Sequence, residues 1–417
     1  MSKTIRVRLC VMMFLEFFIW GGWFVTLGSF LAANLHASGA QSALAYSTQS
    51  WGAIIAPFII GLIADRYVNA ERLLGVLHLT GGLLMYALYR AGDFAAFYPW
   101  VLTYMILYMP TLALVNAIAF RQMDEPARHF SGLRVWGTIG WIVAGLVISY
   151  LFAWDSRGAI GAGLLRNTFL MCALASLALG LYSFTLPRTP PQPRDGEPLR
   201  LKHLLGLDAL QLLRQRNFGI FFLASILICI PLAFYYQNAN QFLTEIQVAN
   251  ATGKQTIGQM SEVLFMLLIP VFLRTFGMKT TLLVGMLAWA CRYLLFAFGN
   301  AQELALMLIV GIALHGVCYD FFFVSGQIYT DSKAGPAYKA AAQGLITLAT
   351  YGLGMLIGFS AAGFIDDLYS AGGRHDWRAI WLYPAAFAAA VFVLFALTFR
   401  NEKVAYHVSA APSSGRA

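Results

Sequence analysis

The sequence predicts an all-α membrane protein whose twelve transmembrane helices form two pseudo-symmetric six-helix bundles. Three observations predict it: the composition, the spacing of long apolar runs, and a single long polar stretch near the middle of the chain. Of the 417 residues, 59% are hydrophobic and only 11% are charged, whereas soluble domains average about 45–50% and about 25%. So few charges cannot cover a soluble protein of this size, which excludes an ordinary soluble enzyme and a disordered chain.

Long apolar runs recur along the whole chain. A helix needs about 20 mostly apolar residues to cross a bilayer. The first run is too long for the core of a signal peptide, so we interpret it as a retained span. Twelve segments meet the length requirement, namely 9–33, 41–64, 72–90, 96–120, 132–154, 165–186, 217–243, 256–273, 280–299, 302–329, 340–365 and 378–399.

One polar stretch, 187–216, interrupts this pattern between the sixth and seventh spans. It contains five prolines and six basic residues, a composition typical of a linker. The stretch divides the chain into a first six-helix bundle over 1–186 and a second over 217–400. Residues 401–417 are expected to form a short tail.

Basic residues are distributed unequally between the two sides of the expected spans. With both termini in the cytoplasm, 20 of the 28 lysines and arginines fall in cytoplasmic segments, 6 on the other side and 2 inside spans. Cytoplasmic loops carry an excess of Lys and Arg, so the count predicts cytoplasmic termini. The net charge of +9 is spread over these loops and does not indicate a nucleic-acid partner.

The loop after the second expected span carries a glycine, an acid and two bases: Gly61, Asp65, Arg66 and Arg72. Glycine allows close helix packing, and the charged residues can latch the ends of neighbouring helices. The corresponding loop of the second half, 274–279, keeps a glycine and bases but lacks the acid. Together with the two sets of six helices, this loop resembles the signature of the major facilitator superfamily. The resemblance implies a solute site between two halves, at the membrane midplane.

Charged side chains inside the expected spans are candidate functional groups, because a charge at the bilayer centre is costly. Five charged residues and two histidines occur there: Glu16, His78, Arg134, Glu262, Arg292, His315 and Asp320. His78 has no polar neighbour on its own helix face, so we expect a structural role for it. Glu16 could carry a proton or form a structural pair.

Two pairs of polar residues are spaced to share a helix face. Gln259 and Glu262 are three positions apart, and their amide and carboxylate could bind the hydroxyl groups of a solute. The carboxylate could also take up a proton, or form a structural ion pair. Arg134 and Thr138 are four positions apart and Trp141 follows. Arg134 could hold a solute oxygen, clamp Glu262, or extend to the membrane surface.

The expected span 302–329 places His315, Tyr319 and Asp320 close together, with the histidine and the tyrosine on one face. Asp320 could carry a transported proton or pair with Arg292 of the preceding span. His315 could contact a solute or be a satisfied structural histidine. The residue types leave these alternatives open.

The segment 235–241 carries two tyrosines and four amides, with Tyr236 among them. Such a run cannot face lipid, so it is expected to line a cavity or a helix interface. Amides recognise hydrogen-bonding edges and aromatic rings stack on flat ligands. The combination favours a planar polar solute.

The sequence contains no pattern of a metal centre or a hydrolase. The five cysteines lie in apolar stretches, without a CxxC or a Cys/His cluster. Neither HExxH nor GxSxG occurs. We therefore expect a transporter and not an enzyme, with no metal or cofactor other than a coupling proton. A solute sensor with a transporter fold and a passive facilitator are the alternatives.

Several segments together resemble the bacterial nucleoside:H⁺ symporters, a family of the same superfamily. The resemblance runs over essentially all expected spans. The segments that carry it are Trp20-Gly21-Gly22-Trp23, Tyr108-Met109-Pro110-Thr111, Arg134-Val135-Trp136-Gly137-Thr138-Ile139-Gly140, Leu204-Leu205-Gly206-Leu207-Asp208-Ala209, Gln259-Met260-Ser261-Glu262, Ile269-Pro270, Tyr319-Asp320-Phe321-Phe322, Ala342-Gln343-Gly344 and Asp376-Trp377. The family implies nucleoside uptake driven by a proton gradient, in the bacterial inner membrane, by a monomer.

The resemblance also implies roles for individual residues. Arg134, Thr138, Gln259 and Glu262 match the family's substrate contacts, Tyr319 lies where the family has a phenylalanine against the base, and Asp320 matches a family aspartate. Together with the polar and aromatic groups found above, the expected solute-binding and pocket residues are Arg134, Thr138, Trp141, Tyr236, Gln259, Glu262, His315 and Tyr319. The expected proton carriers are Asp320, Glu262 and Glu16.

Four positions depart from the family pattern. The family's amide contacts in the seventh span fall on Ala233 and Tyr236. A family tyrosine is replaced by His315, and Glu16 stands where a glutamine is expected. Because these positions surround the expected pocket, a different small polar solute, such as a sugar or a sugar derivative, is the alternative substrate.

Overall fold

The computed structural model describes residues 2–60, 63, 67–123, 126–191, 207–372 and 374–402. Helices make up nearly all of this part of the chain, and η marks short π- or 3₁₀-helical segments. The elements are α1 (Lys3–Phe24), α2 (Leu27–Asn34), α3 (Gly39–Ile59), α4 (Ala70–Arg90), α5 (Phe94–Arg121), α6 (Pro126–Leu146), η2 (Val147–Leu151), α7 (Arg157–Gly161), η3 (Leu164–Arg166), α8 (Asn167–Ser183), η4 (Leu207–Arg214), α10 (Arg216–Glu245), α11 (Ala251–Phe298), α12 (Ala305–Tyr319), η5 (Asp320–Val324), α13 (Ser325–Thr347), η6 (Leu348–Gly354), α14 (Met355–Leu368), β1 (Ser370–Ala371), β2 (Arg374–His375) and α15 (Trp377–Thr398).

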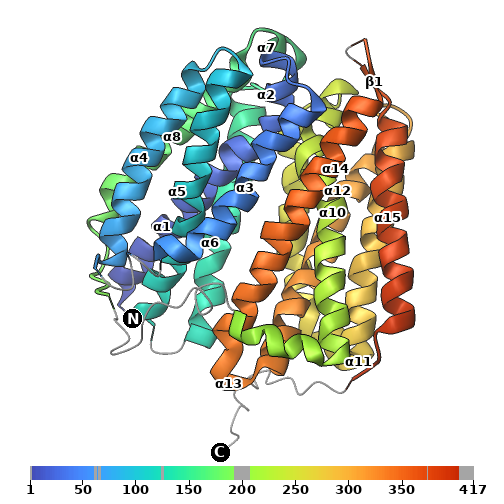
Figure 1. The fold of residues 1–417 in the computed structure, drawn as a ribbon. Coiled ribbons are helices and arrows are strands. Elements are labelled where there is room, and N and C mark those ends of the chain that lie inside the picture. The colour runs from blue at the N-terminus through green and yellow to red at the C-terminus, as the bar shows by residue number, and fades with distance from the viewer. Residues whose placement is uncertain are drawn as a thin grey trace, which may run out of the picture.

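The long helices run side by side in two groups. Figure 1 shows α1 to α8 on one side of the molecule and α10 to α15 on the other. The start of α1 and the end of α15 lie at the same end, which we call the terminal end. α2, α7 and the hairpin of β1 and β2 lie at the opposite end, which we call the far end.

Ten helical runs among the described residues are long and apolar enough to cross a membrane. One of them, α11, has 48 residues and would measure about 72 Å if straight, more than twice the apolar thickness of a bilayer. It is interrupted at Gly277, whose φ of 75° and ψ of 174° are not helical and favour glycine. The sequence places a loop at this point. That both parts of α11 and also α3 cross the membrane, giving twelve spans, stays a prediction.

The expected latch loop lies mostly outside the described residues. Gly61, Asp65 and Arg66 belong to the part that is not described. Arg72 is exposed in the first turn of α4. The latch therefore stays a prediction as well.

The two groups of helices approach each other closely through glycines near the far end. A Cβ atom on Gly39 of α3 would overlap the backbone of Gly363 on α14, and the reverse is also true. A Cβ atom on Gly28 of α2 would overlap the carbonyl group of Gln237 on α10. Small residues let membrane helices pack at short distances, so these glycines fix where the two groups touch.

Two carboxylates join the groups at the far end, and each accepts hydrogen bonds from the start of a helix in the opposite group. Asp367 Oδ1 and Oδ2 accept from the N–H groups of Gly39 and Ala40, at 2.6 and 2.8 Å. Asp155 accepts from the N–H group of Thr252 at the start of α11, at 2.9 Å. A carboxylate at a helix N-terminus satisfies free N–H groups and is favoured by the helix dipole. These two contacts hold the far end closed.

Replacing Asp155 and Asp367 together by alanine is expected to open the far end. Each contact contributes roughly 0.5–2 kcal/mol, as helix caps do, so the open-to-closed ratio should rise by about ten-fold or more. Spin labels at the exposed residues Ala33 and Gln247 will report a longer distance by pulsed EPR. Asp93→Ala, which removes a cap from α5 within one group, is the control. An unchanged distance distribution in the double variant would contradict the role of these contacts.

A further contact at the far end depends on pH. The hairpin places His375 against Glu245 at the end of α10, with Nδ1 2.9 Å from Oε2 and the backbone N–H donating to Oε1 at 3.1 Å. Burial alone lowers the pKa of His375, but the hydrogen bond to Glu245 and its negative charge outweigh burial and raise the pKa overall. The protonated histidine therefore ties the hairpin to α10.

The hairpin should loosen as the pH rises. Because the pKa of His375 is raised in the folded protein, the stabilisation is fully present below the unfolded value of about 6.5 and is lost as the pH rises through the raised value. The contact is partly exposed, so the change should be roughly 0.5–1 kcal/mol. Hydrogen exchange of residues 370–375, corrected for its intrinsic pH dependence, measures it. His375→Gln should remove the pH dependence, and its persistence in that variant would count against this pair.

Candidate functional site

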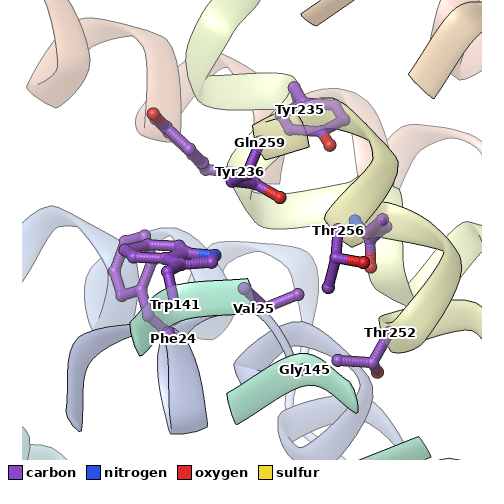
Figure 2. A pocket seen from close by; sticks show the side chains of 11 residues that line it. Phe24, Val25, Trp141, Gly145, Tyr235, Tyr236, Thr252, Thr256 and Gln259 are labelled. Carbon is purple, nitrogen blue, oxygen red and sulfur yellow. The ribbon is translucent and has the colours of Figure 1, made fainter. Parts of the chain in front are cut away.

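A small cavity lies between the two groups of helices, where α1, α6, α10 and α11 meet (Figure 2). Its volume is about 20 Å³, room for roughly one water molecule. Figure 2 shows Trp141 and Phe24 on one side of it and Tyr236 and Gln259 on the other. The lining residues are Gly21, Phe24, Val25, Trp141, Gly145, Tyr235, Tyr236, Thr252, Gln255, Thr256 and Gln259. The cavity is too small for an organic solute and has to widen before it can hold one.

Three of the solute-binding residues expected from the sequence line this cavity: Trp141, Tyr236 and Gln259. The other five do not line it, namely Arg134, Thr138, Glu262, His315 and Tyr319. Tyr235 links the two sets, because it lines the cavity and its ring stacks on His315 with 5.2 Å between ring centroids. The expected site therefore divides into a cavity and an adjoining polar cluster.

The polar cluster is built around a chain of three side chains. His315 Nε2 lies 2.8 Å from Glu262 Oε1. On the other side of the ring, Arg292 Nη1 lies 2.9 Å from His315 Nδ1. Arg292 is fully buried, and its guanidinium carbon lies 3.4 Å from the centroid of the Tyr235 ring. The chain runs from a buried cation, through an imidazole, to a carboxylate that is 18% exposed.

The directions of these hydrogen bonds set the protonation of the histidine. A guanidinium group can only donate, so His315 Nδ1 accepts and its proton is on Nε2. That N–H then donates to Glu262, which accepts as a carboxylate. The negative charge of Glu262 offsets the positive charge of Arg292 through the neutral ring between them. Loss of that negative charge would leave Arg292 without a counter-charge inside the membrane, which is costly, so Glu262 is held ionised in this state.

Two glycines bring α11 and α12 close enough for this chain to form. A Cβ atom on Gly316 would lie 2.5 Å from Ser261 Oγ, and one on Gly258 would lie 3.1 Å from the Cβ atom of His315. The N–H group of Gly316 donates to Ser261 Oγ at 2.9 Å. Each glycine therefore neighbours a residue of the chain, and the small size of both sets the spacing of the two helices.

Asp320 begins the π-helical segment η5, a kind of distortion that is frequent at functional sites. It is fully buried, and neither carboxylate oxygen has a hydrogen-bond partner among the described residues. The pairing with Arg292 considered from the sequence is not formed, because Arg292 donates to His315. Tyr319, which precedes Asp320 in the sequence, contacts Tyr351 of η6, with 3.0 Å between the hydroxyl oxygens. Nothing in the sequence singled out Tyr351.

Arg134 does not clamp Glu262 in this state. The guanidinium carbon of Arg134 lies 3.9 Å from the centroid of the Phe17 ring of α1, and Glu262 contacts His315 instead. A Cβ atom on Gly137 would lie 2.8 Å from the Arg134 side chain, so this glycine makes room for the guanidinium. Thr138 is partly buried on the same helix.

The structure gives His78 polar partners that its own helix face does not offer. Its Nε2 lies 2.8 Å from Glu16 Oε2 and its Nδ1 lies 3.1 Å from Ser176 Oγ. Both partners belong to other helices, 62 and 98 residues away. Helix-face arguments cannot reveal such contacts, because they consider one helix at a time.

The amide run of α10 lies mainly in helix interfaces. Gln237 and Asn238 both donate to the carboxylate of Asp366 on α14, at 2.8 and 2.7 Å. Asn240 accepts from Ser29 of α2 at 2.7 Å and donates to Gln255 of α11 at 2.6 Å. The amides of this run thus lie mainly in helix interfaces, while Tyr235 and Tyr236 line the cavity.

A sequence profile described as "Nucleoside H+ symporter" matches residues 2–404. The chain belongs to this family. The symporter is similar to YegT of Escherichia coli (strain K12), with 42% identity over 402 residues, which are 94% of this chain and 93% of that protein. It is 34% identical to a xanthosine permease of the same organism, over 95% of this chain and 96% of the permease.

Solved structures agree with this assignment. The symporter matches a crystal structure of the nucleoside transporter NupG with a TM-score of 0.84 and 29% identity, over 95% of this chain and 100% of that one. It also matches a POT family transporter, PepTSo, with a TM-score of 0.73 and 14% identity, over 95% and 98% of the two chains. The symporter has the major facilitator fold and is a multi-pass membrane transporter, not an enzyme.

Removing His315 is expected to leave a buried charge without a partner. His315→Leu removes the hydrogen-bond acceptor of Arg292 Nη1, and breaking a buried pair from one side costs roughly 3–5 kcal/mol. The double variant His315→Leu/Arg292→Met removes the charge as well and should recover most of the loss. Thermal unfolding in detergent measures both. Equal destabilisation of the single and double variants would argue against the chain of side chains described here.

Proposed function

We propose that the symporter imports nucleosides across the bacterial inner membrane by alternating access, driven by a proton gradient. Both termini would lie in the cytoplasm, and the protein would work as a monomer. The halves 1–186 and 217–400 would rock against each other about the cavity, with the linker 187–216 between them. The state described above, closed at the far end, would then be one that opens towards the cytoplasm.

The observation that carries the proposal is the position of Glu262, which contacts His315 and lies one helix turn from Gln259 in the cavity wall. A carboxylate accepts two hydrogen bonds at once, and an amide both donates and accepts. Together these groups suit the neighbouring hydroxyls of a ribose. When the cavity widens, the aromatic side chains of Trp141, Tyr236 and Tyr319 would stack on the base.

The opposite half would complete the site. Arg134 and Thr138 lie on α6, which faces α11 across the cavity at Gly145. The Arg134 guanidinium would leave the Phe17 ring and donate to a solute oxygen. His315 would hold Glu262 in the orientation that the solute requires.

Asp320 is the proposed proton carrier of the second half. A buried carboxyl group without a hydrogen-bond partner is stable only when it is neutral, so Asp320 would hold a proton in this state. Glu262 is less suited to the role while Arg292 requires its charge. Movement of α12 at η5 would expose Asp320 and release the proton.

The loop of Gly61, Asp65, Arg66 and Arg72 would latch helix ends at the terminal end when that end closes. Asp155 and Asp367 perform the equivalent task at the far end. The two sets of contacts would then alternate during a transport cycle.

Glu262→Gln is expected to abolish gradient-driven accumulation of nucleosides. The amide cannot offset Arg292 and accepts fewer hydrogen bonds from a ribose, so we expect a loss of about 100-fold or more, corresponding to roughly 3 kcal/mol at a charged hydrogen bond. Uptake of labelled uridine and adenosine by proteoliposomes, with an inward proton gradient, measures it. Glu303→Gln, at an exposed carboxylate, is the control. Undiminished accumulation in Glu262→Gln would overturn the role of Glu262, and no uptake by the unmodified protein would overturn the substrate.

A further inference from the structure

A second buried cluster of polar groups lies in the first group of helices, apart from the solute cavity. Glu16 of α1 and His78 of α4 are 0% and 1% exposed and meet at 2.8 Å. Thr111 of α5 lies 2.6 Å from Glu16 Oε1. Ser176 of α8 lies 3.1 Å from His78 Nδ1. Four helices therefore each contribute one side chain.

The hydroxyl group of Ser176 fixes the proton on one side of the imidazole. Ser176 Oγ donates to the backbone carbonyl of His78 at 2.9 Å. A serine hydroxyl has a single proton to donate, so Oγ must accept from His78 Nδ1. The Nδ1 atom is therefore protonated.

A second proton must lie between His78 Nε2 and Glu16 Oε2. Without it, two lone pairs would face each other at 2.8 Å, and an unpaired negative charge would be fully buried. With it, the pair is neutral whether the proton is nearer to the carboxylate or to the imidazole. The structure thus contains a pair that is stable only while it holds one exchangeable proton.

The other titratable groups described around the pair supply no positive charge that could take the place of that proton. Tyr108 of α5 lies against the His78 ring, with 6.1 Å between centroids, and Tyr104 stacks on Tyr108 at 5.4 Å; both phenols are neutral groups. From α6, Arg134 lies over the ring of Phe17 and forms no ion pair with Glu16 in the described part of the chain. Among the residues that the structure describes, His78 is therefore the group placed to offset Glu16.

We propose that Glu16 and His78 form an occluded proton-binding site of the first half, separate from Glu262 and Asp320. The inference rests on the proposed function only in so far as the bound proton is one of those that drive transport. It adds a proton to each cycle, beyond the proton assigned to Asp320. The site loads and unloads when α1 and α4 separate far enough to admit water.

Short contacts connect this site to the solute cavity. The Tyr108 hydroxyl donates to the backbone carbonyl of Glu16 at 2.7 Å. One turn further along α1, the ring of Trp20 lies 5.9 Å from that of Tyr108 and 5.5 Å from that of Trp141, measured between centroids. A Cβ atom on Gly21 would lie 2.7 Å from Trp141. A displacement of α1 at Glu16 is therefore transmitted to the cavity wall.

Glu16→Gln tests the proposal. The glutamine amide can donate to His78 Nε2 and its oxygen can accept from Thr111, so both contacts survive while the exchangeable proton is lost. In proteoliposomes, the number of protons carried per nucleoside, measured from the reversal potential, should fall by one. Nucleoside exchange without a gradient should continue at a rate within about two-fold of the unmodified protein. Glu303→Gln should change neither quantity.

A direct proton count makes the test independent of transport. Purified protein is taken from about pH 9 to about pH 5 with a pH indicator, and Glu16→Gln should take up one proton fewer than the unmodified protein. This difference is expected even if the protein carries no nucleoside, so failure of the proposed substrate and failure of this site are distinguishable. An equal proton count together with an unchanged ratio of protons to nucleoside would overturn the proposal and leave a purely structural pair.

The double variant Glu16→Gln/His78→Gln guards against misfolding of the single one. Two amides can hydrogen-bond to each other and bind no proton near neutral pH. It should therefore show the same loss of one proton. A proton count equal to that of the unmodified protein would overturn the proposal in this variant too.

Discussion

The arrangement of the polar groups depends on one constraint: a charge inside the membrane must be offset there. Arg292 is fully buried and cannot lose its proton, so some carboxylate has to remain ionised within reach of it. Glu262 meets this need through the ring of His315. Keeping these three side chains in line requires the spacing of α11 and α12, the glycines between these helices and the stacking of Tyr235. The proposed solute site uses Glu262, the partly exposed end of that line.

The two halves use the same pair of residue types for opposite purposes. In each, a glutamate meets a histidine at 2.8 Å. In the second half, Arg292 donates to the other nitrogen of the imidazole. The glutamate then supplies the counter-charge and can act as a hydrogen-bond acceptor. In the first half, the other nitrogen of the imidazole contacts Ser176. Serine supplies no charge, so the glutamate and the histidine must share a proton. The partner of the second imidazole nitrogen, Arg292 or Ser176, therefore decides whether each pair suits the solute-binding or the proton-binding role proposed for it.

The sequence predicted what depends on composition and on single helices. It predicted the all-α fold, the charged residues inside helices and the shared helix face of Gln259 and Glu262, while the linker 187–216 stays a prediction. It missed the partners of His78, because these lie on helices 62 and 98 residues away, and it left the partner of Arg292 undecided. Tyr351 carried no signal, since one tyrosine in an apolar helix is ordinary. Asp155 and Asp367 lay just outside the expected spans and could pass for loop residues.

The strengths of the contacts differ in a way that alternating access requires. The far end is held by two carboxylates on helix N-termini, the exposed Asp367 and the buried Asp155, and each contributes on the order of 1 kcal/mol. A few such contacts can break and reform in every cycle. The chain of Arg292, His315 and Glu262 involves buried charges whose separation costs several kcal/mol, and all three lie in the second half. It can therefore stay intact while the halves rock, so that the cycle opens the ends of the molecule without dismantling the site between them.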